Sequence, residues 1–444
     1  MGLPKKALKE SQLKYLTAGS AVDDGSHQIF RVTFIENGVQ KAAFFKKLEP
    51  KNHYPELLAK ISVATSVFKR IFQGQNSAEE RLVFNEQEQL IGTLSIAVDG
   101  FKPFNYANEP IPLDPSLKEL VIPNTKTLID KNAMSILFGR WFLDDDDTHP
   151  HNLGFVGDAT VDIDFDMFWY WFTIYMKEPR PVIGVPKKRV SLSLRDWETF
   201  PNAKDAKHYH CPTYQYPGQE TLPIVMPFLP KSYADPSQFQ RLANDPLAKE
   251  QQLVAALQTL LTYNPEMVRA RLTEIFGSMS LNYTSLDATD VKLRAKYEEE
   301  FPSFCNPQTN VQSFVDFMLS MYQEHYDNLY RIVVFYMGCD NNGYGVPLPA
   351  MNVALYKKPS LYRTIVTWVK LQNETLHSKD DDVIRYNLDE VQKRYHQVWR
   401  DAFAPNLKQL LHDSFNLTNK LFKVASSIEV IPEISGKKTT DDSV

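Results

Sequence analysis

Residues 144–155, which read DDDDTHPHNLGF, decide how the fold is assigned. They follow the apolar run ILFGRWFL at 136–143, and residues 147–152 within them have the form D-x-H-x-x-N. Asp164 comes twelve residues after Asn152, within the tetrapeptide IDFD. A run of acids alone is typical of a solvated loop, but the ordered asparagine and the later aspartate indicate a chemical role.

Phosphoryl transfer needs a cation on the nucleotide phosphates, oxygen ligands for magnesium, and an acid near the attacking hydroxyl. Mg²⁺ keeps several waters, so one Asp and one Asn can suffice from the protein. We expect Asp147 to orient or deprotonate the hydroxyl and His149 to support it as a structural member of the loop. Asn152 and Asp164 are the expected ligands of Mg²⁺ or Mn²⁺, and Asp166 adds a carboxylate beside them.

Composition sets the broad class. The chain has 444 residues, of which 43% are hydrophobic and 23% charged, as in folded soluble proteins. Its net charge of −5 argues against nucleic-acid binding through global charge. The three cysteines support neither a disulfide framework nor a zinc knuckle, which fits a reducing cytosol. We expect no secretory signal and no transmembrane segment, because no apolar run reaches about 18 residues.

Local patterns predict a sheet-rich N-terminal part. Residues 27–48 read as a β-hairpin turning at Asn37-Gly38, and Pro55 opens a helix that Gly74 ends. A second hairpin follows at about 81–98, and a helix from about Lys126 to Leu143 leads into the acid run. The aromatic run at 167–176 is expected to pack under the cleft, residues 175–230 read as loop, and the chain beyond about Pro236 as mostly helical.

Together these patterns predict an α+β fold with two lobes and a site in the cleft between them. The expected domains are an N-lobe at 1–98, a C-lobe at 99–280, a helical extension at 281–430 and a disordered tail at 431–444.

The motifs resemble those of the lipid-kinase branch of the kinase superfamily. Phosphatidylinositol 3- and 4-kinases carry D-R-H-x-x-N and, about a dozen residues later, I-D-F-G. Thr148 stands where that pattern has a basic residue, and Asp166 stands where it has glycine.

A closer resemblance, over roughly residues 28–280, is to kinase-like effectors that Legionella-type bacteria inject through type IV secretion. It rests on residues 144–155, on Ile163–Met167 (IDFDM), and on the GFKP stretch at 100–103. This resemblance implies a bilobal kinase-like fold, ATP as cofactor and a phosphoinositide as substrate. It also implies a protein secreted from the bacterial cytoplasm into a host cytosol, where it is peripheral to membranes and able to meet a host protein.

The same resemblance implies the nucleotide contacts. Lys46 is the strand lysine on the phosphates, with Lys47 as its competitor, because strand alternation turns only one of them into the cleft. Glu56 is the first choice for the acid that pairs with this lysine, and Glu79 and Glu80 are the alternatives. Residues 93–98, including Ser95, would form the hinge that binds adenine through its backbone, and residues 18–27 would cover the phosphates.

Other readings stay open. The same fold could be a protein kinase or a catalytically silent scaffold. Asp162-Ile163-Asp164 is also a D-x-D, as in metal-dependent glycosyltransferases. His149 and His151 could instead hold zinc or iron, with His208, His210 or Cys211 completing the site. A basic set after the metal motif could bind inositol phosphates or an anionic membrane, or could simply be solvated: Lys177, Arg180, Lys187, Lys188 and Arg189.

Overall fold

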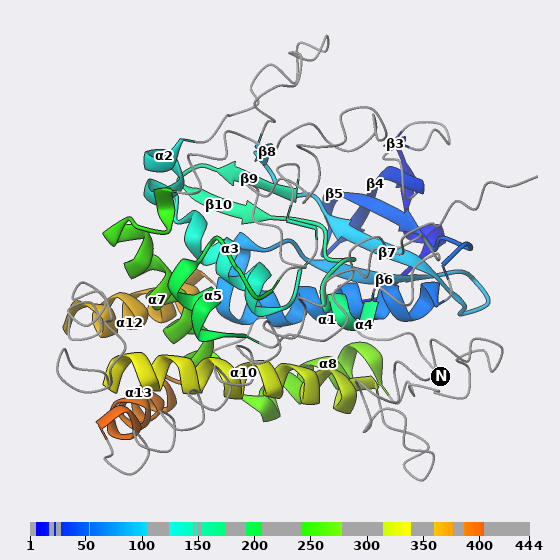
Figure 1. Cartoon of the computed structure of the whole chain (residues 1–444). Helices are drawn as coiled ribbons and strands as arrows, with labels where there is room; N and C mark the ends of the chain where they lie inside the picture. The colour runs from blue at the N-terminus through cyan, green and yellow to red at the C-terminus, as the bar shows by residue number, and fades with distance from the viewer. Residues whose placement is uncertain are drawn as a thin grey trace, which may run out of the picture.

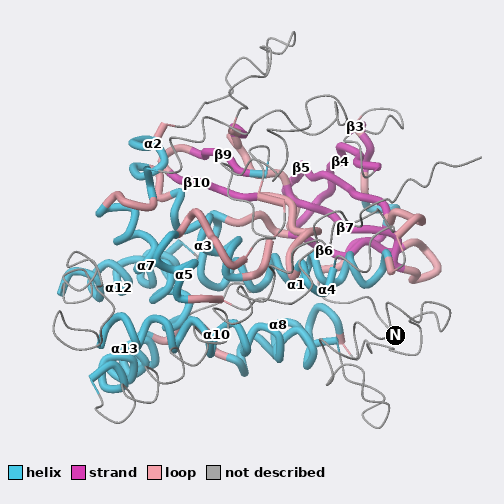
Figure 2. The backbone as a smooth tube through the Cα atoms, in the orientation of Figure 1, coloured by secondary structure: helices cyan, strands magenta, loops and turns pink. Residues whose placement is uncertain are grey.

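The described part of the chain is a mixed α and β structure in which the strands gather on one side and the helices on the other (Figures 1 and 2). The computed structural model describes residues 6–16, 22–23, 28–52, 54–104, 124–145, 147–148, 152–173, 192–206, 241–277, 314–338, 359–375 and 386–403.

A seven-stranded sheet forms the N-terminal part. Its strands are β1 (Leu8–Lys9), β2 (Lys14–Tyr15), β3 (Val22–Asp23), β4 (Gln28–Glu36), β5 (Val39–Lys47), β6 (Glu80–Phe84) and β7 (Leu90–Ile96). Their order is β1-β6-β7-β5-β4-β2, with β3 also on β4. The β4–β5 hairpin turns at Asn37 and Gly38, which both have positive φ, as a two-residue hairpin turn requires. Both predicted hairpins are confirmed.

Helix α1 (Pro55–Gln73) is the predicted helix after the first hairpin. Pro55 occupies its first turn, and Gly74 ends it with φ of 61°, a conformation that favours glycine. The helix contacts β6 and β7 on one side and helices of the C-terminal half on the other, as Figure 1 shows. Most of its side chains are therefore buried, so α1 is a central element rather than a surface helix with one apolar face.

The chain leaves the large sheet after Ile96 and joins a three-stranded sheet of β8 (Lys102–Pro103), β9 (Leu153–Val156) and β10 (Ala159–Asp162). Between β8 and β9 lie α2 (Thr125–Asp130) and α3 (Ala133–Phe142). The single helix predicted from Lys126 to Leu143 is thus wrong: Asn132 adopts a left-handed conformation with φ of 55°, which interrupts it.

Within the described residues the remaining α-helices are α4 (Tyr170–Thr173), α5 (Leu194–Thr199), α7 (Pro246–Thr262), α8 (Pro265–Phe276), α10 (Phe314–Gly338), α12 (Pro359–Thr375) and α13 (Leu388–Phe403). The helical C-terminal half is confirmed. The stretch predicted as loop contains α5, whose first turn is capped because Ser193 accepts a hydrogen bond from the Asp196 amide. Phe168, Trp169 and Phe172 of the aromatic run are buried, as expected for packing.

One apolar core joins α1 and α3 to α7, α8, α10, α12 and α13, and a smaller core fills the opposite face of the large sheet. The ring of Tyr322 on α10 stacks on that of Phe68 on α1, with centroids 4.5 Å apart. Tyr386 donates a hydrogen bond to the carbonyl of Ile71 on the same helix. The helices beyond residue 280 therefore share their core with the preceding part. The predicted domain limits stay a prediction, and the tail at 431–444 lies outside the described residues.

Candidate functional site

The site is centred on an ion pair between Lys46 on β5 and Asp164, which follows β10. Lys46 Nζ lies 2.5 Å from Asp164 Oδ1. Lys47 takes the other face of the strand, where its Nζ lies 5.2 Å from the ring centroid of Phe30. Strand alternation thus separates the two lysines as expected, and Lys46 is the one that faces the aspartate.

Three carboxylates keep Lys46 charged. Burial by itself lowers the pKa of this ammonium, but the charges of Asp164, Asp166 and Glu80 outweigh burial and raise the pKa above its ordinary value. The side chain of Lys46 is only 12% exposed. A fixed positive charge in such a partly dry place is suited to an anionic ligand, because little water screens it.

Glu80, on β6, is the acid beside Lys46. It is buried, its Oε2 accepts a hydrogen bond from Ser62 of α1, and its backbone N–H donates to Ser66 Oγ over 3.0 Å. Burial raises the pKa of the Glu80 carboxyl; the repulsion of Asp164 and Asp166 adds to this, Lys46 and Ser62 oppose it, and the pKa is about 7. Helix α1 therefore does not supply the acid; it supplies Ser62 and Ser66, which form hydrogen bonds with the side chain and the backbone of Glu80.

The first choice for this acid, Glu56, lies elsewhere. Its side chain is 61% exposed at the start of α1, and its carboxylate lies 3.9 Å from Lys60 one turn along the helix. The assignment of Glu56 to the lysine pair is therefore wrong, and Glu80 is the glutamate whose charge acts on Lys46. The reason is that Glu56 lies on the solvent-facing side of α1. Because most residues of α1 are buried, its sequence pattern does not show which side faces solvent.

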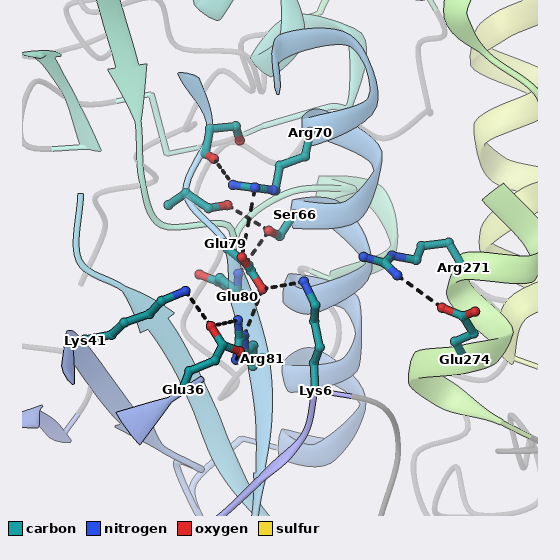
Figure 3. A network of polar contacts seen from close by, with 12 residues as sticks. Lys6, Glu36, Lys41, Ser66, Arg70, Glu79, Glu80, Arg81, Arg271 and Glu274 are labelled. Carbon is teal, nitrogen blue, oxygen red and sulfur yellow. Dashed lines mark hydrogen bonds and ion pairs between the residues drawn. The ribbon is translucent and has the colours of Figure 1, made fainter. Parts of the chain in front are cut away.

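Glu79 belongs to a separate network on the other face of β6 (Figure 3). Its carboxylate lies 2.8 Å from Arg81 Nε, 3.2 Å from Lys6 Nζ and 3.9 Å from an Arg70 nitrogen. Burial would raise the pKa of Glu79, but these three cations outweigh it and lower the pKa well below its ordinary range. Because neighbouring strand residues face opposite ways, Glu79 and Glu80 cannot both serve Lys46.

Asn152 and Asp147 are held together in the loop before β9. The Asn152 Nδ2 donates to the Asp147 carbonyl at 3.0 Å and to its Oδ2 at 3.2 Å. The Ile163 N–H donates to the Asn152 carbonyl at 3.0 Å, so the backbone next to Asp164 lies beside the loop. The predicted residues Asp147, Asn152 and Asp164 are thus brought to one region. His149 and His151 lie outside the described residues.

Asp144 and Asp145, the other described acids of the run, have separate structural partners. Asp145 is buried; its Oδ1 accepts the Asp147 N–H at 3.1 Å, and its Oδ2 accepts the Thr148 hydroxyl at 2.6 Å. Asp144 Oδ2 lies 3.2 Å from Nε2 of His325 on α10. Thr148 stands where the lipid-kinase pattern has a basic residue. It stabilises the loop because its hydroxyl donates a hydrogen bond to Asp145.

Asp164 has a φ of 66°, in the left-handed region that non-glycine residues rarely occupy. Such strained positions persist where surrounding contacts hold them, and they gather at functional sites. Asp166 lies close by and lines a small pocket together with Lys46, Lys47, Ser62 and Thr93. A small ligand could thus approach the Lys46 and Asp166 side chains from this pocket.

The carboxylate and amide oxygens of this region form a hard donor set, which fits Mg²⁺ or Mn²⁺ rather than zinc. Among the described residues, no three His, Cys, Asp or Glu side chains come together as a metal cluster. An Asn–Asp pair completed by water and phosphate oxygens would not form such a cluster, because one of its protein ligands is an amide.

Ser95 is not in a hinge. It lies inside β7, paired with Phe44 of β5 and Glu80 of β6, so the sheet surrounds it on both sides. Ladder bonds continue to Ala97, whose N–H donates to the Ala42 carbonyl at 3.0 Å. The expected role of Ser95 at adenine is therefore corrected: the connection between the two sheets begins only after Ala97.

Three buried charges were not predicted from the sequence: Lys69 on α1, Arg140 on α3 and Asp162 at the end of β10. Lys69 forms an ion pair with Asp162, whose Oδ2 also lies 3.4 Å from Arg140 Nε. The available signal was the placing of Lys69 and Arg140 within apolar helical runs, where a charge needs a buried partner.

A scan against protein-family models and a search of curated proteins found no match to this chain.

Proposed function

We propose that this chain is a magnesium- and ATP-dependent kinase with a bilobal kinase-like fold, transferring the γ-phosphate to a hydroxyl. The observation that supports this most strongly is the contact between Lys46 and Asp164, which lie 118 positions apart in the sequence. The family resemblance implies a phosphate-binding role for Lys46, and the motif order predicts a metal-binding role for Asp164. The bond between Asn152 and Asp147 supports the same reading, because it places the expected metal ligand beside the expected acid.

In this proposal each residue has one task. Lys46 binds the nucleotide phosphates and neutralises part of their charge, while Glu80 and Ser62 keep its ammonium in place. Asn152 and Asp164 hold Mg²⁺ or Mn²⁺, which when bound would neutralise charge on the transferring phosphoryl group. Asp147 orients or deprotonates the acceptor hydroxyl, and His149 supports it. Asp166 is a further carboxylate for the metal.

The preferred acceptor is a phosphoinositide, by the resemblance to lipid kinases and to type IV secretion effectors. A peripheral membrane site in a host cytosol, with a possible host protein partner, follows from the same resemblance. No helix in the described part of the chain has the length and apolar character needed to cross a membrane. The basic residues between Lys177 and Arg189, expected to contact anionic lipid, lie outside the described residues.

The glycosyltransferase reading is disfavoured by the position of Asp162. A D-x-D site offers both carboxylates to a metal-bound nucleotide sugar, but the Asp162 side chain is fully buried between Lys69 and Arg140. Only Asp164 of the pair is partly exposed, at 22%. The zinc or iron reading rests on His149, His151, His208, His210 and Cys211, which lie outside the described residues.

The test is incubation with Mg-[γ-³²P]ATP and three separate acceptors: phosphoinositide vesicles, a protein mixture and soluble inositol phosphates. The proposal predicts labelled lipid from the wild-type chain and none from Asp164→Asn. Labelled protein alone would replace the lipid acceptor with a protein kinase activity. No label in any acceptor, together with hydrolysis of a nucleotide sugar, would overturn the kinase.

A further inference from the structure

Arg140 lies at the C-terminal end of α3 and is fully buried. Its guanidinium is nevertheless surrounded by oxygen atoms. Nη1 lies 2.5 Å from Asp145 Oδ2 and donates to the Asp147 carbonyl at 3.2 Å. Nη2 donates to the carbonyls of Asn152 and Ile163, at 3.3 Å and 2.7 Å.

These contacts reach both segments of the proposed site. Asp147 and Asn152 belong to the loop before β9, and Ile163 directly precedes Asp164. One planar group therefore binds the backbone of the proposed base, of one metal ligand, and of the residue next to the other metal ligand. Asp145, which pairs with Arg140, also fixes the loop, because its carboxylate accepts hydrogen bonds from the Asp147 N–H and the Thr148 hydroxyl.

The Nε side of the guanidinium is held by a second carboxylate, that of Asp162. Asp162 Oδ2 lies 3.4 Å from Arg140 Nε and also pairs with Lys69 of α1. Lys69 Nζ lies 4.6 Å from the centroid of the Phe168 ring, and the Arg140 guanidinium carbon lies 5.4 Å from the same centroid. Two basic side chains, Lys69 and Arg140, and two carboxylates, those of Asp145 and Asp162, thus form a buried cluster that connects α1 to the loop.

We propose that Arg140 is the positioning residue of this site: it binds the carbonyls of Asp147, Asn152 and Ile163 and thereby fixes Asp147, Asn152 and Asp164 relative to one another, while Asp162 and Lys69 hold Arg140 in place. This role in turnover rests on the proposed kinase function. The reason it must be arginine is geometric: a guanidinium offers five donors in a fixed plane, whereas lysine offers a single ammonium on a flexible stem. Lysine at this position would retain the charge but could not span the four oxygens.

The test compares Arg140→Lys with Arg81→Lys. Arg81 is a matched control, because it is also buried and binds carboxylates, those of Glu36 and Glu79, but within the N-terminal sheet (Figure 3). Rates are taken per folded molecule, with folding measured by thermal unfolding. Arg140→Lys is expected to lower kcat about 100-fold, since misplacement by about 1 Å can cost that much, while KM for ATP changes far less. Arg81→Lys is expected to keep wild-type kcat.

Hydrogen exchange gives a readout that does not depend on turnover. The amides of Asp147 and Ile163, which are bonded in the wild type, should exchange faster in Arg140→Lys and at the wild-type rate in Arg81→Lys. Wild-type kcat in folded Arg140→Lys, or equal exchange in the two variants, would overturn the positioning role. A wild-type chain without phosphotransferase activity would overturn the proposed function instead, and the exchange comparison would still decide whether Arg140 fixes the loop.

Discussion

Lys46 Nζ and Asp164 Oδ1 lie 2.5 Å apart, although Lys46 belongs to a strand of the large sheet and Asp164 follows the last strand of the small sheet. This contact joins the two halves of the molecule at one point. The charges of Asp166 and Glu80 also stabilise the Lys46 ammonium, which is in contact with Asp164. A dication bound to Asp164 would neutralise that carboxylate. Lys46 would then be available to interact with Glu80 and with the phosphates of a ligand.

The two neighbouring lysines should differ sharply in their effect on turnover. Lys46→Met is expected to lower kcat/KM for ATP at least about 100-fold, because it removes the only cation expected to neutralise phosphate charge from β5. Lys47→Met is expected to stay within about twofold, because the Lys47 ammonium lies over the Phe30 ring and Asp164 pairs with Lys46 instead. Steady-state rates of ADP formation measure both. Equal losses in the two variants would contradict the assignment of Lys46.

Asp164→Asn should abolish turnover and leave the fold intact. Asparagine tolerates the left-handed conformation that Asp164 adopts, so the backbone is not strained by the change. The loss is expected to exceed about 1,000-fold, because a neutral amide binds the metal poorly where a carboxylate is required. Asp158→Asn is the control: its side chain is fully exposed in the turn between β9 and β10. Thermal unfolding and turnover of Asp164→Asn that both match Asp158→Asn would refute the metal assignment.

Glu80 should make stability fall as pH rises. Its pKa is about 7 in the folded chain against an ordinary 4.5, so between these values the folded state holds a proton that the unfolded state releases. The protonated form favours folding below pH 4.5, and this contribution, about 3 kcal/mol, is lost as pH rises through 7. Glu80→Gln should therefore become more stable relative to the wild type across this range, as measured by denaturant unfolding.

The pH dependence of stability that comes from Glu79 should have the opposite sign, which Glu79→Gln can test. The cations around Glu79 lower its pKa, so its charge stabilises the fold above the ordinary pKa, and that contribution is lost as pH falls. At neutral pH this variant should be less stable than the wild type, whereas Glu80→Gln should not be. An identical pH profile for Glu80→Gln and the wild type would show that Glu80 does not titrate in this window.

A chain ending at residue 280 should not fold. Phe68, Ile71 and Phe72 of α1 lie in a core that α10, α12 and α13 help to form, and truncation would expose it. Gel filtration and circular dichroism should find aggregated or expanded material. If the shortened chain were monomeric with the wild-type melting temperature, the C-terminal helices would be a separate extension after all.

Elements with local signals could be predicted from the sequence. The Asn37-Gly38 turn, the Pro55 start and Gly74 end of α1, and the order of the loop and metal motifs depend on neighbouring residues. The partners of Lys46 depend on tertiary contacts instead. The sequence favours Glu56 because it lies in the helix after the lysine strand, whereas the packing of β6 against α1 brings Glu80 near Lys46.

The buried charges could not be predicted for the same reason. Arg140 meets oxygens from residues 145–163, and Lys69 meets Asp162, 93 positions away. The break at Asn132 was also hidden, because an asparagine in a helical pattern is compatible with either continuation or a left-handed end. The resemblance implies a hinge at residues 93–98, including Ser95, but the ends of strands are hard to locate from sequence and the sheet extends beyond Ser95 to Ala97.

The central claim, that Lys46 and Asp164 together hold Mg-ATP, is tested most directly by calorimetric titration of ATP with and without Mg²⁺. The wild-type chain and Lys47→Met should bind ATP in a magnesium-dependent way, while Lys46→Met and Asp164→Asn should lose that binding. Absence of ATP binding by the wild type, or magnesium-dependent binding that survives both substitutions, would contradict the claim.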